Sequence, residues 1–316
     1  MDESGFTWTS PLGVGWDGAV THSDAMLDTF EAHRTTLTGV AYRMLGRVAD
    51  AEDIVQEAWL RWSAADRGEV REPRAFLVRI TTRLAIDRLR HVQSRREAYV
   101  GPWLPEPIAT AYGDASTTVP DTAERAVLAD SVSFAVLVVL ESLSPLERAV
   151  FVLREAFGFP YAEIGIALDR TEAAVRQLAG RARRHVEERK PRYDVDPAQQ
   201  RDLTERFLAA ATHGDLAGLL ELLAPDVRLV SDSGGKAKAP LRVMWSADKV
   251  GRFLAAVAQE SLVGLDFRFA EVNGAPALVV LADGRPDSVV AVGVADGRIA
   301  DIYLVRNPDK LTGLDR

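Results

Sequence analysis

The chain of 316 residues contains no cysteine. This absence excludes a disulfide framework, a thiolate metal site and a cysteine nucleophile, and it fits a reducing compartment. The first residues, MDESGFTWTSPLGVGWDG, lack the basic start and the apolar core of a signal peptide. No apolar run in the sequence is long enough to span a bilayer. We therefore expect a cytoplasmic protein without a membrane partner.

Basic residues are outnumbered by acidic ones, because 38 Lys and Arg stand against 46 Asp and Glu, which gives a formal net charge of -8. That balance argues against a protein that binds nucleic acid through bulk attraction. The arginines are nevertheless concentrated in two places, residues 79–96 and residues 176–192, where few carboxylates accompany them. Two separated basic helices in an acidic chain indicate two discrete contacts with a polyanion.

Composition and hydrophobic periodicity divide the chain into blocks. Residues 1–23 are expected to be a disordered N-terminal extension, and residues 24–96 have the pattern of successive helices, one of which begins at Pro73. Residues 97–122 are rich in Pro, Gly, Ser and Thr and show no sustained period. This composition predicts a flexible linker between two folded blocks.

The segment DAEDIVQEAWLRW, residues 50–62, combines an apolar stripe with an acidic and amide face. At the helical period, one side gathers Ala51, Ile54, Val55, Ala58 and Trp62, and another gathers Asp53, Gln56 and Glu57. An ordinary solvated helix face would explain the polar side by itself. The chain around this helix soon turns strongly basic, so the neighbouring segments must decide whether the polar face has a further role.

The second block, residues 123–192, predicts a helix-turn-helix. Its segment SPLERAVFVLRE has Ser144, Pro145 and Glu147 placed for a capping box. A short helix, a turn and a longer helix capped by Thr171 follow. The exposed side of the longer helix presents Arg176, Gln177, Arg181 and Arg184, which suit base edges and phosphates. A plain helical bundle is the alternative, but it does not need the arginines.

The third block, residues 197–316, mixes helices and strands. Two helical segments, a strand, a helix and a run of apolar strands succeed one another, and the strands are separated by Asn273-Gly274, Asp283-Gly284 and Asp296-Gly297. Each pair favours a tight hairpin turn. The order predicts an α+β cone, in which a curved antiparallel sheet wraps on helices.

Such a cone can enclose a catalytic pocket, and five residues are candidates for its lining: His213, Arg228, Asp232, Arg242 and Trp245. His213 is better explained as a helix end beside Gly214, and Asp232 as part of a glycine-rich loop. Fold analogy alone does not provide chemistry. We expect no enzymatic activity, no catalytic residue, no cofactor and no metal.

The ordered segments DAEDIVQEAWLRW, AFLVRITTRLAIDRLR, LSPLERAVFVLREAFGFPYAEIGIAL and TEAAVRQLAGRARR resemble regions two and four of extracytoplasmic-function sigma factors. Three further motifs, WLPEP (103–107), DSGGK (232–236) and NPDKL (307–311), resemble the sigma J-like branch, which has a C-terminal SnoaL-like domain. The resemblance implies a multidomain fold: an all-α region-two bundle, an all-α region-four helix-turn-helix and an α+β SnoaL-like cone.

The resemblance also implies a function, which is to direct RNA polymerase core enzyme to promoters. The helix at 50–62 would dock on a coiled coil of the beta-prime subunit through Asp53, Gln56 and Glu57. Carboxylates and an amide suit an arginine-rich partner, because charge-assisted hydrogen bonds fix register as well as affinity.

Promoter DNA would be the second partner. The resemblance assigns the minus-ten element to the basic helix that bears Arg79, Arg83, Arg88 and Arg90, with the DRGEVREP loop helping to hold a flipped base. It assigns the minus-thirty-five element to Arg176, Gln177, Arg181 and Arg184. The chain departs from the family at Arg83, where many members have Asn, and at Asp169, where the turn often has Gly. Asp tolerates the left-handed conformation, so the motif survives.

The third block would regulate the sigma blocks in cis. Gly234 and Gly235, between Asp232 and Lys236, allow the backbone to turn sharply and approach another surface. A loop that merely joins two elements is the alternative. The sequence leaves open whether the domain restrains or supports the sigma blocks, and whether it binds a small molecule.

Two other classes of function compete with this interpretation. A free-standing helix-turn-helix regulator leaves the acidic helix and the linker unexplained. A cyclase or isomerase leaves both basic helices unexplained.

Overall fold

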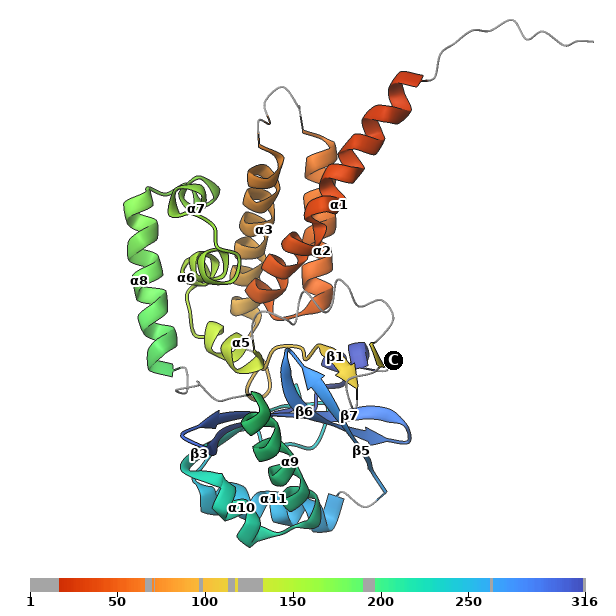
Figure 1. Ribbon diagram of the computed structural model, residues 1–316, viewed down its shortest axis with the longest axis vertical. Coiled ribbons are helices and arrows are strands. Elements are labelled where there is room, and N and C mark those ends of the chain that lie inside the picture. The colour runs from red at the N-terminus through yellow and green to blue at the C-terminus, as the bar shows by residue number, and fades with distance from the viewer. Residues whose placement is uncertain are drawn as a thin grey trace, which may run out of the picture.

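The first helical block consists of three helices, α1 (Asp17–Leu45), α2 (Val48–Ser63) and α3 (Pro73–Arg96) (Figure 1). The structure is a computed structural model that describes residues 17–65, 70, 72–96, 99–112, 117–118, 133–189, 197–261 and 264–314. Because α1 begins at Asp17, the disorder expected up to residue 23 is wrong for residues 17–23. Residues 1–16, for which disorder was also expected, and the tip of the DRGEVREP loop lie outside the described residues.

The predicted faces of α2 are confirmed. Its buried side chains include all five residues of the apolar stripe: Ala51, Ile54, Val55, Ala58 and Trp62. Helix α3 begins at Pro73, as predicted, where the missing N–H of proline costs no helical hydrogen bond.

The second helical block contains α5 (Phe134–Leu140), α6 (Pro145–Phe151), a π-helical turn η1 (Val152–Ala156), α7 (Tyr161–Leu168) and α8 (Glu172–Arg189). The capping box of Ser144 and Glu147 is present at the start of α6. Asp169 ends α7 in the left-handed conformation, with φ 55°, and the Thr171 hydroxyl accepts a hydrogen bond from the backbone N–H of Ala174 at 3.3 Å. The helix-turn-helix is therefore confirmed.

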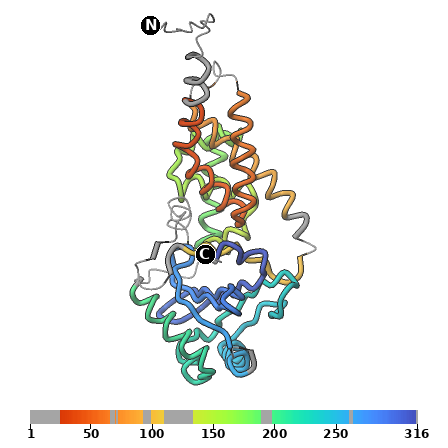
Figure 2. Tube along the Cα trace, turned by 90° about the vertical axis from the view of Figure 1, so that its right-hand side faces the viewer, coloured from red at the N-terminus to blue at the C-terminus, as the bar shows by residue number. Residues whose placement is uncertain are grey.

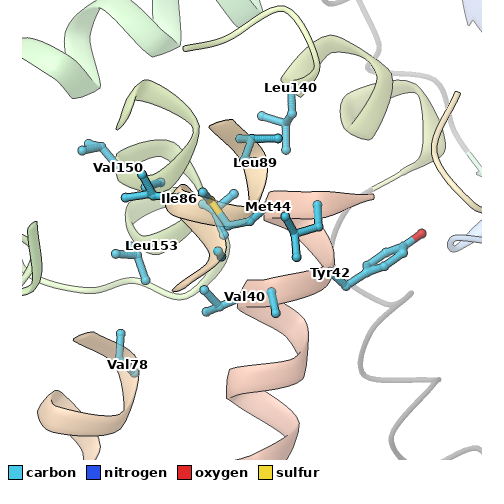
Figure 3. Packing of buried hydrophobic residues seen from close by; sticks show 14 of the residues in the cluster. Val40, Tyr42, Met44, Val78, Ile86, Leu89, Leu140, Val150 and Leu153 are labelled. Atoms are coloured by element: carbon cyan, nitrogen blue, oxygen red, sulfur yellow. The ribbon is translucent and has the colours of Figure 1, made fainter. Parts of the chain in front are cut away.

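The two helical blocks share one hydrophobic core. Figure 3 shows Val40 and Met44 of α1 and Leu89 of α3 beside Val150 of α6 and Leu153 of η1, and all five side chains are buried. A shared apolar core holds elements together with the same driving force that folds a single domain. The blocks are thus packed against each other in this structure.

The third block is the cone. Helices α9 (Pro197–His213), α10 (Leu216–Leu222) and α11 (Ala247–Ser261) lie on the face of the sheet away from the helical blocks, as Figures 1 and 2 both show. The strands are β3 (Leu223–Asp232), β4 (Met244–Trp245), β5 (Asp266–Val272), β6 (Ala275–Ala282), β7 (Arg285–Ala295) and β8 (Arg298–Val305). Two 3₁₀ turns, η2 (Pro308–Lys310) and η3 (Thr312–Leu314), end the described chain.

The sheet has the order β2-β1-β5-β6-β7-β8-β3-β4. Its hairpins turn at Asn273-Gly274, Asp283-Gly284 and Asp296-Gly297, and every one of these residues has a positive φ, as the sequence predicted. The sheet is not antiparallel throughout, because β3 runs parallel to β8. These two strands are far apart in the sequence, so no hairpin fixes their relative direction.

The predicted linker, residues 97–122, is partly folded, which corrects that expectation. Residues 99–112, which we call the connecting segment, lie against the cone, and Leu104 and Ile108 are buried. Strand β1 (Ala109–Tyr112) extends the sheet beside β5, and β2 (Thr117–Thr118) pairs with β1. The local sequence has no period because its partners lie far along the chain.

Candidate functional site

A buried ion pair fastens the connecting segment to the cone. The Lys310 ammonium lies 2.6 Å from Oδ2 of Asp232, and the two side chains are 3% and 0% exposed. The Asp232 carboxylate also accepts hydrogen bonds from the Tyr99 hydroxyl at 2.6 Å and from the backbone N–H of Leu104 at 2.8 Å. Lys310 donates a further bond to the Leu104 carbonyl. Buried charges are tolerated only with such complete pairing.

Aromatic rings complete this junction. The Lys310 ammonium lies 3.9 Å from the centroid of the Trp103 ring and 5.4 Å from that of Tyr99, within the range of cation–π attraction. Burial, together with the hydrogen bond to Asp232, raises the pKa of the Tyr99 phenol. The phenol therefore stays protonated and keeps donating to the carboxylate.

The glycine-rich loop approaches the connecting segment closely. A Cβ on Gly234, which has φ +56°, would lie 2.9 Å from the Tyr99 hydroxyl oxygen, and one on Gly235 would lie 3.2 Å from Val100. One expectation needs correction: Asp232 is the buried last residue of β3 and not part of the glycine-rich loop. Lys236 of that loop pairs with Asp309 of the cone. The motifs WLPEP, DSGGK and NPDKL meet at this junction. The sequence of each motif alone does not indicate which residues it contacts.

A second junction joins the connecting segment and the cone to the start of α2. The Glu106 carboxylate accepts a hydrogen bond from the backbone N–H of Val48 at 3.0 Å, in the first turn of α2. The Glu106 carbonyl accepts the Tyr42 hydroxyl proton at 2.8 Å, and the same hydroxyl accepts from the Asn273 side-chain amide at 2.9 Å. A carboxylate at a helix N-terminus is favoured by the helix dipole. Sequence reasoning assigned Asn273 only to a turn and missed this contact.

The second helical block also rests on the cone. The ring of Phe134 in α5 lies 5.7 Å from that of Tyr303 in β8, and both residues are buried. Burial raises the pKa of the Tyr303 phenol. The cone therefore contacts both helical blocks.

The acidic face of α2 is accessible. Asp53 and Gln56 are exposed, and Glu57 is partly exposed and paired with Arg61 at 3.0 Å. Leu60 lies one turn beyond Gln56 and is 56% exposed. The polar face and this apolar side chain are thus both accessible on α2.

The basic face of α3 is engaged within the chain. Arg83 donates from Nε to the carbonyl of Ala167 in α7 at 3.0 Å, so the second helical block contacts this side chain. Arg88 pairs with Asp50 at 2.6 Å, a bond that raises the pKa of Arg88, and it lies 3.6 Å from Asp53. The other two predicted residues, Arg79 and Arg90, contact Phe76 and Asp87 of the same helix.

Two buried arginines, which sequence reasoning missed, lie between the helical blocks. Arg148 of α6 donates to the Met44 carbonyl at the end of α1 and to Glu141, both at 2.8 Å. Arg43 of α1 lies 5.1 Å from the centroid of the Phe157 ring of the second block. Burial lowers the pKa of Arg43 to about 10, so the side chain remains a cation at neutral pH. A buried arginine has no periodic signal that separates it from a surface one.

Helix α8 presents its predicted residues to solvent. Arg176, Gln177, Arg181 and Arg184 are all exposed. Arg176 pairs with Glu172 and lies 5.0 Å from the Tyr161 ring centroid, and Arg181 pairs with Glu147 at 3.0 Å. The hydrogen bond from the Ser144 side chain lowers the pKa of Glu147, and Arg181 lowers it further.

The cone encloses a cavity of about 430 Å³. Its lining is mainly apolar and contains none of the five residues considered for a catalytic pocket from the sequence. Arg228 pairs with Asp301, and Trp245 is exposed. Within the described ranges, no group of three or more His, Cys, Asp or Glu side chains is arranged to hold a metal ion.

None of the helices in the part of the chain that the structure describes has the length and apolar character needed to cross a membrane.

Comparisons with known proteins agree with this organisation. The sigma-70 region 2 family matches residues 29–96, and the sigma-70 region 4 family matches residues 133–186. The chain is 42% identical over 297 residues to the ECF RNA polymerase sigma factor SigJ of Mycobacterium tuberculosis H37Rv, covering 90% of this chain and 92% of the relative. It is 36% identical over 292 residues to the probable ECF RNA polymerase sigma factor SigI of the same species, covering 92% and 96%.

The same organisation appears in a solved structure. The crystal structure of the Mycobacterium tuberculosis SigJ protein superposes with a TM-score of 0.72 at 37% identity, covering 91% of this chain and 98% of that one.

Proposed function

Because the chain belongs to the extracytoplasmic-function sigma factors, which direct RNA polymerase core enzyme to promoters, we propose that its fold is a closed state that must open before both helical blocks can bind one promoter. The observation that supports this is the contact between the blocks: they share a core, and Arg83 of the basic helix binds the Ala167 carbonyl of the helix-turn-helix.

The spacing of promoter elements gives the physical reason. The minus-ten and minus-thirty-five elements lie about 25 base pairs apart, which is roughly 85 Å at ~3.4 Å per base pair. Packed helix axes lie only about 10 Å apart. In the closed state α7 packs directly on α3, and the recognition helix α8 packs on α7. The two DNA-binding helices therefore need to separate by tens of ångströms, on the scale of roughly 85 Å between the elements.

The cone and the connecting segment favour the closed state. The cone binds the first block through Asn273 and Tyr42 and the second through Tyr303 and Phe134. Because all these groups are in one chain, even weak contacts act at a high effective concentration. The domain thus restrains the sigma blocks, and anything that loosens either junction increases the open population.

We assign the polymerase-binding face to Asp53, Gln56, Glu57 and Leu60 on α2, with the beta-prime subunit as the partner. The Glu106 contact at the first turn of α2 connects this face to the connecting segment. The cone has a binding and restraining role without catalysis, and the protein acts in the cytoplasm with the polymerase.

Replacing Asp53 and Gln56 by Ala is expected to weaken association with core polymerase by about 2 kcal/mol, as for interface hot spots. Leu60→Ala adds to this loss, because an apolar anchor is removed. The measurement is competition binding to core enzyme, with Glu31→Ala at an exposed position of α1 as the matched control and circular dichroism to confirm helix content. Unchanged binding of the double variant would contradict the assignment of this face.

Arg176→Ala is expected to cost about 1 to 3 kcal/mol of upstream promoter discrimination, because a guanidinium that reads a base edge is lost. Transcription in vitro on a panel of minus-thirty-five variants measures the effect, with Arg206→Ala on the cone as the control. A loss of the same size on every promoter variant would show that Arg176 contacts phosphate and does not read a base.

A further inference from the structure

The cavity of the cone has the size and lining of a small-molecule site. Phe207 and Ala211 of α9, Phe253 of α11, Leu278 of β6 and Val290 of β7 contribute to its apolar wall. A cavity of about 430 Å³ lies within the range that proteins use for ligands. The apolar wall favours an apolar ligand body, because its burial removes hydrocarbon surface from water.

Polar groups gather in one part of the lining. Arg306 holds Asp287 in a two-point ion pair, Nε to Oδ2 and Nη2 to Oδ1, both at 3.1 Å. Lys238 also lines the cavity, is exposed, and has no ion pair or side-chain hydrogen bond with any residue that the structure describes. Two cations against one carboxylate leave one positive charge. The buried Ser288 also lines the cavity and adds a hydroxyl to its wall.

We propose that this cavity binds a small amphipathic monoanion, a carboxylic acid with a straight or aromatic apolar body, whose carboxylate pairs with Lys238. The lining has no histidine, and its single carboxylate is already held by Arg306. The chemistry is therefore that of binding, with no acid–base pair in the wall to act on the ligand.

The site is connected to the junction that holds the connecting segment. Lys238 and Pro240 belong to the same loop as Gly234 and Gly235, which touch Tyr99 and Val100. Arg306 links the two ends of this loop: Nη1 donates to the Lys238 carbonyl at 2.7 Å, and its backbone N–H donates to the Asp232 carbonyl at 2.7 Å. A ligand that moves Lys238 therefore acts on the loop that touches the connecting segment. This regulatory consequence rests on the proposed function, whereas the binding site itself does not.

The test is isothermal titration of the full chain with decanoate and with decylammonium, which share an apolar body and differ in charge. Decanoate is expected to bind one molecule per chain at least about tenfold more tightly than decylammonium. Lys238→Ala is expected to weaken decanoate binding about tenfold. Lys236→Ala, two residues away and paired with Asp309, is the matched control and should change it by less than about twofold.

A filling variant separates the cavity from the protein surface. Ala211→Phe is expected to abolish decanoate binding. The melting temperature shows whether this variant is folded. If it is not, Val290→Phe is used as the filling variant in its place. Equal binding of the two amphiphiles, unchanged affinity in Lys238→Ala, or full binding in a folded filling variant would overturn the site. The titration contains no polymerase, so its failure leaves the closed-state proposal standing, and failure of that proposal leaves the binding site standing.

Discussion

Lys310→Ala is expected to lower the free energy of unfolding by about 3 to 5 kcal/mol, because it leaves the Asp232 carboxylate buried without its counterion. Lys310 and Asp232 are almost completely buried, and together they bind the hydroxyl of Tyr99 and both backbone polar groups of Leu104. The connecting segment should therefore detach from the cone. Urea unfolding measures the stability, and chymotrypsin cleavage at Tyr99 to Leu104 reports detachment.

Two variants control this prediction. Lys236→Ala removes an exposed ion pair with Asp309 and should cost less than about 1 kcal/mol. The double variant Asp232→Leu with Lys310→Met removes both charges and should recover part of the loss, because no unpaired buried charge remains. If Lys310→Ala and Lys236→Ala cost the same, or if cleavage of the connecting segment is unchanged, the buried pair does not hold that segment.

Gly39→Leu is expected to open the closed state, because it places a side chain between the two helical blocks. Gly39 lies within α1, where a Cβ would come within 2.8 Å of Nη1 of Arg43 in the same helix and within 2.9 Å of Cζ of Phe157 in the second block. Overpacking of this kind costs up to about 3 kcal/mol, whereas leucine for glycine within a helix gains up to about 1 kcal/mol. Core polymerase binding should tighten by about tenfold or more, because a larger fraction of the chain is open.

Tighter binding to core polymerase distinguishes opening of the closed state from damage to the fold, which would weaken binding. Binding to core enzyme is measured by fluorescence anisotropy, and thermal unfolding is followed in parallel. Phe157→Ala removes the part of the clash that involves the second block, so the double variant should be more stable than the sum of the two single changes. Weaker polymerase binding by folded Gly39→Leu would show that the contact between the blocks supports activity instead of restraining it.

The helices of both sigma blocks could be predicted because their signals are local. The apolar stripe from Ala51 to Trp62 and the capping box of Ser144 and Glu147 are complete within a few turns of chain, and both are present in the structure. The three hairpin turns were predictable for the same reason, since glycine and Asn or Asp directly supply the required positive φ.

The junctions could not be predicted, because their partners are far apart in the sequence. Glu106 lies among prolines and shows no helical or strand period, yet it binds Val48 and Tyr42 of the first block. Asp232 lies beside glycines, which predicts a loop, but its counterion Lys310 fixes it in the interior. The predicted faces on α2 and α8 are exposed, whereas Arg83 on α3 is engaged by α7 through a contact that the sequence does not signal.

The absence of cysteine makes the most direct test of the closed state simple, because two introduced thiols are the only ones in the chain. Ala32→Cys on α1 and Ala162→Cys on α7 are both at exposed positions and suit spin labels. Pulsed electron spin resonance then gives the distance between the two helical blocks. The closed state predicts one narrow distance distribution for the free protein and a shift of tens of ångströms on binding core polymerase with promoter DNA, since the two promoter elements lie roughly 85 Å apart. A distance distribution that is already broad and long in the free protein, or one that does not change in the promoter complex, would contradict the account.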